Sequence, residues 1–120
     1  MPFLSMSGSD RVRLRHMLDA AREAIEFASG RTAPDLATDR VRALALVRCI
    51  EIIGEAASRV EAGSRLAIPD LPWADIIGMR NRLIHAYFDV DLALVCETIQ
   101  TDLPPLVSRL EGLLALDEDG

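Results

Sequence analysis

The chain has 120 residues, half of them hydrophobic and only 4% aromatic, so it can build one domain with an aliphatic core. All 13 basic residues are arginine. The formal net charge is −6, which argues against a protein that coats nucleic acid through a broad basic surface. No apolar run approaches the roughly 18 residues that span a bilayer, and no signal-peptide pattern opens the chain. We therefore expect a cytoplasmic protein that does not associate with membranes.

The N-terminal third predicts one amphipathic helix. Apolar residues recur at three- and four-residue spacing over 11–29, and Asp10 is a suitable cap for that segment. Gly30 follows directly, where a residue in the left-handed conformation often ends a helix.

The second predicted helix runs from about Arg40 to about Val60, after a connection that offers Thr38 or Asp39 as its cap. Its interior is apolar on almost every side, so other structure must cover it from more than one direction. In a chain this small, a second copy is a plausible cover, which favours a homodimer. Gly54 in mid-helix costs about 1 kcal/mol relative to alanine, and we expect another backbone to approach closely there.

Turn signals and apolar spacing place the remaining helices. A loop over 64–71 leads to Pro72, which suits the first turn of a helix. The predicted helices that complete the fold are 72–88, 91–101 and a last helix that begins after Asp102.

No strand pattern, repeat or low-complexity tract interrupts this succession. We expect residues 10–116 to form one all-α domain, a four- to five-helix up-down bundle. Residues 1–9 would be a flexible leader and residues 117–120 a solvated acidic tail. Cys49 and Cys96 lie in apolar helical patterns and are expected to be buried thiols. Two separated histidines and two separated cysteines predict no metal site, and nothing predicts a cofactor.

A polar segment over 79–91 stands where a plain bundle helix would be expected. Arg80 can bind the non-bridging oxygens of a phosphodiester through a bidentate guanidinium. RNA brings its own nucleophile, the 2′-hydroxyl, so the protein must mainly move a proton, and histidine, here His85, is the natural side chain for that task. On one helix, these two side chains would border the same groove. Asn81, one turn before His85, can orient the imidazole or bind phosphate, and no metal is required.

Plainer interpretations of these residues stay open. An arginine and a histidine five residues apart also occur by chance, as surface ion pairs or helix caps, in an ordinary interaction protein. Arg82 either adds positive potential beside the cleft or is simply solvated. Glu51 and Glu55 either form an acid pair or are paired with Arg48 and Arg59, and Glu55 is also a candidate for a buried link to an arginine of the polar segment.

The segment resembles the HepT-like branch of the HEPN superfamily, whose mark is arginine, four residues, histidine, one residue and tyrosine. Arg80, His85 and Tyr87 fit that pattern, with the polar residue after the arginine present as Asn81. The similarity runs from about Arg11 to about Leu116. The flanking segments that also resemble the family are EIIGEAA at 51–57, Pro72-Trp73 and IIGMRN at 76–81.

The resemblance implies a toxin of a type VII-like toxin–antitoxin pair. Such proteins form symmetric dimers whose shared cleft cuts RNA without a metal. Their partner is a minimal nucleotidyltransferase antitoxin, which can transfer AMP to the motif tyrosine and silence the ribonuclease. By this resemblance, Arg80 and His85 would be catalytic, Asn81 and Arg82 would support RNA binding, and Tyr87 would be the modified residue.

A second function stays open beside the ribonuclease. The chain can instead be a non-catalytic HEPN binding module that docks a nucleotidyltransferase and regulates it. The acidic composition, without a wide basic surface, favours this alternative.

Overall fold

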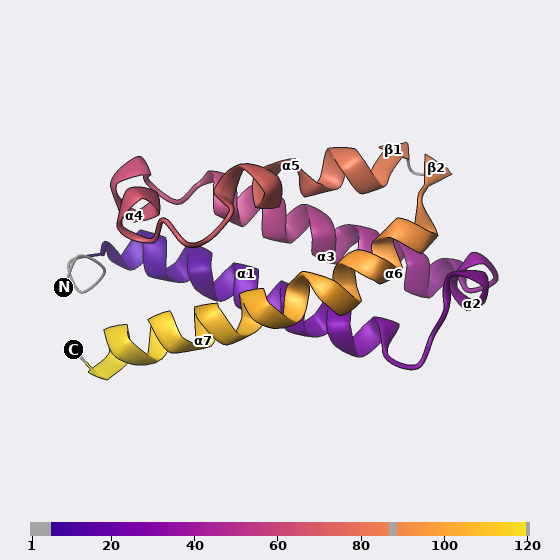
Figure 1. The fold of residues 1–120 in the computed structure, drawn as a ribbon, viewed down its shortest axis with the longest axis horizontal. Coiled ribbons are helices and arrows are strands. Elements are labelled where there is room, and N and C mark those ends of the chain that lie inside the picture. Colours follow the sequence, from indigo (N-terminus) through magenta and orange to yellow (C-terminus); the bar gives the residue numbers. More distant parts are fainter. Residues whose placement is uncertain (1–5, 87–88, 120) are drawn as a thin grey trace.

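The computed structural model describes residues 6–86 and 89–119, and it is helical apart from one short hairpin. The predicted all-α class is confirmed (Figure 1). The elements in chain order are α1 (Gly8–Ala28), α2 (Ala33–Ala37), α3 (Arg40–Ser58), α4 (Ala62–Ala67), α5 (Trp73–Leu83), β1 (Ile84–Ala86), β2 (Asp89–Val90), α6 (Leu92–Thr101) and α7 (Leu103–Asp119).

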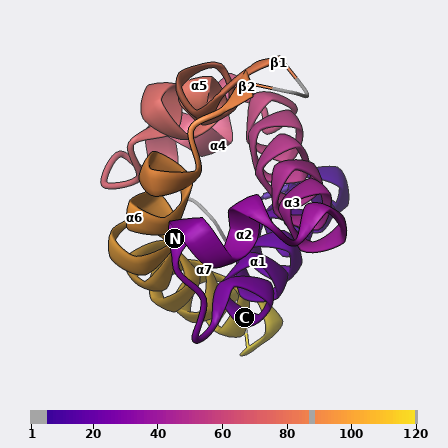
Figure 2. The same ribbon diagram turned by 90° about the vertical axis from the view of Figure 1, so that its right-hand side faces the viewer.

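The long helix α1 is the centre of the packing. It lies against α3 on one side and α7 on the other, while α5 covers α3 and α6 leads into α7. Seen end-on, these helices are arranged around one common core (Figure 2). No helix of the described part of the chain is long and apolar enough to cross a membrane.

The start of α1 differs from the prediction. The helix begins at Gly8, and its cap is the hydroxyl of Ser7, which accepts a hydrogen bond from the backbone N–H of Asp10 at 3.1 Å. Asp10 is therefore not the cap. Its side chain is only 1% exposed, and its carboxylate accepts hydrogen bonds from the N–H of Glu61 and the hydroxyl of Ser64. At the other end of α1, the predicted left-handed residue is confirmed, because Gly30 has φ 72°.

Two connections that were expected to be loops contain short helices. The capping box of Thr32 and Asp35 starts α2, and α4 lies inside the segment that joins α3 to α5. The predicted cap of α3 is confirmed, since the carboxylate of Asp39 accepts from the N–H of Arg42 at 3.1 Å.

Helix α3 is covered from two directions by helices of its own chain. The predicted close approach at Gly54 is confirmed, because a Cβ built there would lie 3.4 Å from the carbonyl oxygen of Ile77 in α5. Much of the apolar circumference of α3 thus faces α1 and α5. Val41, near the start of the helix, is still 81% exposed.

The third long helix ends earlier than predicted. We expected it to continue to about Phe88, but α5 stops at Leu83, and Ile84–Ala86 pairs antiparallel with Asp89–Val90. The N–H of Asp91 also donates to the carbonyl of Leu83 at 2.9 Å. The β-branched residues Ile84 and Val90 pair across the hairpin, and such side chains favour strands. This pairing turns the chain sharply between α5 and α6.

Candidate functional site

The last turn of α5 and strand β1 carry the motif residues. Helix α5 buries Ile76, Met79 and Leu83, whose spacing places them on its inner face. Arg80 is therefore left half-buried at the edge of that face, while Asn81 is exposed.

The guanidinium of Arg80 is held from two sides. Its Nε lies 3.6 Å from Oε2 of Glu51 in α3, and its Nη1 donates to the carbonyl oxygen of Ile84 at 3.4 Å. The Arg80 side chain is 34% exposed and that of Glu51 only 16%. The second terminal nitrogen, Nη2, has no protein partner within residues 6–86 and 89–119. Nη2 is therefore the nitrogen that remains available to donate to a phosphate oxygen.

A small ionic network lies behind Arg80. Arg48 is 3.9 Å from Glu51 and 3.7 Å from Glu55, so the predicted pairing of the glutamates is confirmed for Arg48. Within the described residues, no ion pair joins Arg59 to either glutamate. The predicted link between a glutamate and the motif arginine exists, but it comes from Glu51 rather than Glu55. The network of two arginines, Arg48 and Arg80, and two glutamates, Glu51 and Glu55, thus carries no net charge.

His85 does not lie on the same helix as Arg80, so that prediction is wrong. It is in β1, where Ile84 is buried and the side chain of His85 is exposed, as the alternation of a strand requires. The hydrogen bond from Arg80 to the carbonyl of Ile84 nevertheless brings the guanidinium to the residue directly before His85. The guanidinium of Arg80 therefore lies next to the backbone just before His85, an arrangement that depends on the helix-to-strand turn rather than on helical spacing.

Arg80 and Asn81 line a small open cavity of about 240 Å³ between α3 and α5. Because Gly54 has no side chain, the two helices come together at the floor of this cavity. The cavity also has two carboxylates in its wall, which would repel a phosphate placed deep inside it. The residues that complete its lining are Glu51, Gly54, Glu55, Ser58 and Ile77.

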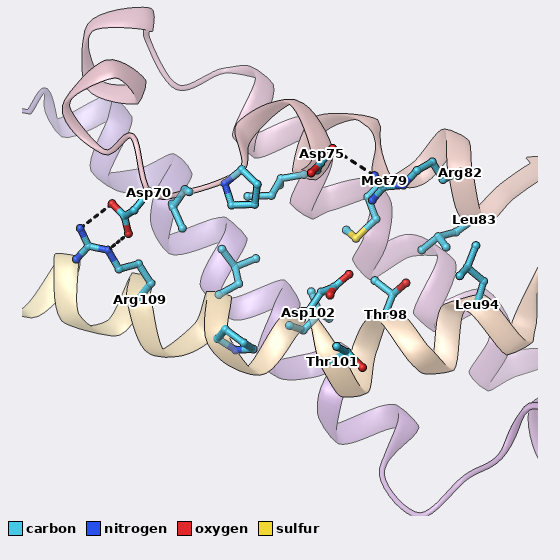
Figure 3. A pocket seen from close by; sticks show the side chains of 16 residues that line it. Asp70, Asp75, Met79, Arg82, Leu83, Leu94, Thr98, Thr101, Asp102 and Arg109 are labelled. Atoms are coloured by element: carbon cyan, nitrogen blue, oxygen red, sulfur yellow. Dashed lines mark hydrogen bonds and ion pairs between the residues drawn. The ribbon is translucent and has the colours of Figure 1, made fainter.

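Arg82 faces a different space. It lies 3.6 Å from Asp75 and lines a larger groove of about 640 Å³ between α5 and the pair α6 and α7 (Figure 3). The floor of that groove is mostly apolar, and at its far end Asp70 pairs with Arg109. The structure therefore separates Arg82 from Arg80 and Asn81. Among the described residues, His85 lines neither cavity.

Tyr87 lies outside the described residues. In the described part of the chain, no group of three or more His, Cys, Asp or Glu side chains is placed to hold a metal ion. Cys49 and Cys96 are buried and free, as predicted. Burial first, and the nearby carboxylate of Glu23 second, raise the pKa of the Cys49 thiol to about 11, so it is neutral at physiological pH.

The sequence did not lead us to expect the contact between Glu51 and Arg80. The neighbour of Glu51 one turn along α3, Gly54, was correctly expected to meet another backbone. A glutamate one turn before such a contact point faces the same neighbouring helix. That spacing was the available signal, and it pointed to Glu51 rather than to Glu55.

Known proteins are similar to this chain over most of its length. The sequence profile described as "Ribonuclease HepT-like" matches residues 17–113. The chain is 32% identical over 108 residues to "Probable ribonuclease HepT" of Thermococcus cleftensis, covering 90% of this chain and 98% of that protein. It is 36% identical over 104 residues to a protein of Caldanaerobacter subterraneus named as a candidate RNase, covering 87% and 93%.

A protein of Methanocaldococcus jannaschii, also named as a candidate RNase, is 32% identical over 98 residues, covering 82% of this chain and 90% of that protein. No solved structure matches the chain at a significant level. The profile and these relatives each span most of the chain, including the polar segment after Pro72. The chain belongs to the HepT-like ribonuclease family.

Proposed function

We propose that this protein is an RNA-cleaving toxin that uses Arg80 and His85 and needs no metal. The observation that carries the proposal is the arrangement of Arg80. Its guanidinium is held at Nε by Glu51 and at Nη1 by the carbonyl of Ile84, has no partner at Nη2 among the described residues, and lies beside the residue that precedes the exposed His85. Family membership supports RNA as the substrate.

The chemistry follows from the groups available. Neutral His85 accepts the proton of the RNA 2′-hydroxyl as the 2′-oxygen forms its bond to phosphorus, and the bond from phosphorus to the 5′-oxygen breaks. The leaving 5′-oxygen takes a proton from a second imidazolium or from solvent, which leaves a 2′,3′-cyclic phosphate and a 5′-hydroxyl. Arg80 stabilises the negative charge that develops on the phosphorane oxygens, while Asn81 binds phosphate or orients the RNA.

We further propose a symmetric homodimer in the cytoplasm, in which two such sites share one cleft. A second copy would supply the second imidazole and would concentrate arginines in a chain whose net charge is −6. Arg82, on the far side of α5, would then contribute positive potential along the rim of that cleft rather than contact the reacting phosphate.

The proposed partner is a minimal nucleotidyltransferase that acts as the antitoxin. The phenol oxygen of Tyr87 would attack the α-phosphorus of ATP, pyrophosphate would leave, and the phenol proton would go to solvent. The added phosphate would be two residues from His85 in sequence, and its negative charge would compete with the RNA phosphate for the guanidinium of Arg80. AMP transfer would therefore silence the ribonuclease.

The proposal is tested with protein freed of any partner and labelled RNA in excess EDTA. We expect cleavage by the wild type, none by His85→Ala, and full activity of the matched control His16→Ala, which removes the other histidine from the exposed face of α1. Cleavage that survives His85→Ala would contradict the mechanism, and loss of cleavage in EDTA would contradict its independence of metal.

The carboxylates beside Arg80 favour one alternative, a non-catalytic module that binds and regulates a nucleotidyltransferase. Glu51 and Glu55 leave the cavity beside Arg80 without net positive charge. This alternative predicts that the chain is harmless when expressed alone and still forms a complex with the nucleotidyltransferase. Arrest of growth by the wild type, relieved by His85→Ala, would exclude it.

A further inference from the structure

We propose that Glu51 is a positioning residue, which holds the guanidinium of Arg80 in the orientation that receives the RNA phosphate. The inference rests on the proposed ribonuclease function, but it concerns a residue outside the arginine, histidine and tyrosine motif. Its basis is the 3.6 Å separation between Oε2 of Glu51 and Nε of Arg80, across the contact between α3 and α5.

Glu51 is a paired carboxylate that is mostly buried. Its side chain is 16% exposed, whereas the carboxylates that pair with arginine elsewhere, such as Asp75 and Glu111, are 73% and 48% exposed. A carboxylate that loses most of its water needs fixed cationic partners. Arg80 and Arg48 supply them, so Glu51 is held in place by the same contacts through which it holds Arg80.

The two anchors of Arg80 act on adjacent positions of its guanidinium. Glu51 faces Nε, and the carbonyl of Ile84 accepts from Nη1, so rotation about the end of the side chain is opposed at both points. Nη2 has no partner among the described residues. A guanidinium fixed before RNA binds does not have to be ordered during the reaction, which is the advantage of a preorganised site.

Arg48 is the second cationic partner of Glu51. It lies 3.9 Å from Glu51 and 3.7 Å from Glu55, so the two arginines and two glutamates form a network without net charge. Glu51 therefore contributes to the site by orienting the guanidinium of Arg80 and not by leaving a surplus of positive charge there.

The first test does not depend on activity. The Nε–Hε group of Arg80 gives an NMR signal that can be assigned by its loss in Arg80→Lys. We expect Glu51→Gln to shift this signal and to speed its exchange with water, while the matched control Glu111→Gln, which breaks the pair with Arg22 between α1 and α7, leaves it unchanged. An unchanged signal in Glu51→Gln would overturn the proposal.

The second test measures cleavage kinetics in the same variants. We expect Glu51→Gln to lower kcat by about 10- to 100-fold, because misplacing a group that acts in the transition state costs rate by such factors. We expect KM to change by less than about threefold, since the rest of the RNA contact is intact. Glu111→Gln should match the wild type in both constants.

The outcomes separate the two proposals. If the wild type cleaves RNA, His85→Ala does not, and Glu51→Gln keeps full kcat, the positioning role is wrong and the ribonuclease stands. If the wild type does not cleave RNA at all, the ribonuclease fails, and the NMR signal alone decides whether Glu51 fixes Arg80. Should Glu51→Gln not fold, as judged by circular dichroism, Glu51→Asp is measured instead, and its shorter side chain must also move the signal.

Discussion

The buried carboxylate of Asp10 offers the sharpest prediction about stability. It accepts hydrogen bonds from the N–H of Glu61 at 3.1 Å and from the hydroxyl of Ser64 at 2.5 Å, and so ties the start of α1 to the start of α4. The segment that contains α4 leads directly into α5, the helix that carries Arg80. Loss of this tie should therefore weaken the part of the fold that supports the site.

The size of the effect follows from the geometry. Hydrogen bonds to charged groups contribute roughly 1.5–3 kcal/mol each, but removing water from the carboxylate offsets part of that gain. We expect Asp10→Ala to lower the free energy of unfolding by about 2–4 kcal/mol. For a chain of this size, that loss lowers Tm by roughly 8–16 °C.

Two further variants separate hydrogen bonding from charge. In Asp10→Asn, the amide oxygen still accepts from Glu61 and the amide nitrogen donates to Ser64, so we expect a loss of only about 1 kcal/mol. Asp19→Ala, at an exposed position of the same helix, should stay within about 0.5 kcal/mol of the wild type. The assay is urea unfolding followed by circular dichroism. If Asp10→Ala unfolds at the wild-type midpoint, or Asp10→Asn is as unstable as Asp10→Ala, the reasoning is refuted.

Two other predictions concern the interior. Gly54→Ala should change the free energy of unfolding by less than about 1 kcal/mol, because the added Cβ, 3.4 Å from the Ile77 carbonyl oxygen, is tolerable and alanine favours the helix. Gly54→Leu should lose about 1–3 kcal/mol by overpacking. An equal urea midpoint for the two variants would contradict this. Because the pKa of Cys49 is raised to about 11, its contribution to stability is full below its ordinary value of 9.0 and is lost as the pH rises toward 11. Alkylation of native protein at pH 8 should therefore leave Cys49 unmodified until denaturant is added, which mass spectrometry of the peptide can check.

Local patterns in the sequence were enough to predict most of the helices. The spacing of apolar residues located α1, α3, α6 and α7, and side-chain caps such as Asp39 marked where one of them starts. Gly30 and Gly54 were assigned their roles because each requires a local property that other residues lack, a positive φ in one case and a missing side chain in the other. These features depend on residues within a few positions of each other, so they can be recognised without the fold.

The errors arose where distant residues compete with local preference. Asp10 is of a residue type that often caps helices, but the partners of its carboxylate lie 51 and 54 residues away, and it is buried against them. The third long helix has enough helical spacing to continue past Leu83, yet pairing of Ile84 with Val90 ends it. Neither the hydrogen-bond partners of Asp10 nor the strand pairing of Ile84 can be identified from the local sequence around each residue.

The candidate site divides in the same way. The sequence alone determined which residue types are present, a guanidinium, an imidazole and an amide within six positions, together with the family to which their spacing belongs. Only the tertiary structure decided how they are presented: Arg80 bound to Glu51 of another helix, Asn81 in the same small cavity, His85 turned outward on a strand, and Arg82 on the opposite side of α5. The physical reason is that side-chain chemistry belongs to each residue, whereas its direction, burial and ionic partners depend on backbone segments that meet only when the chain folds.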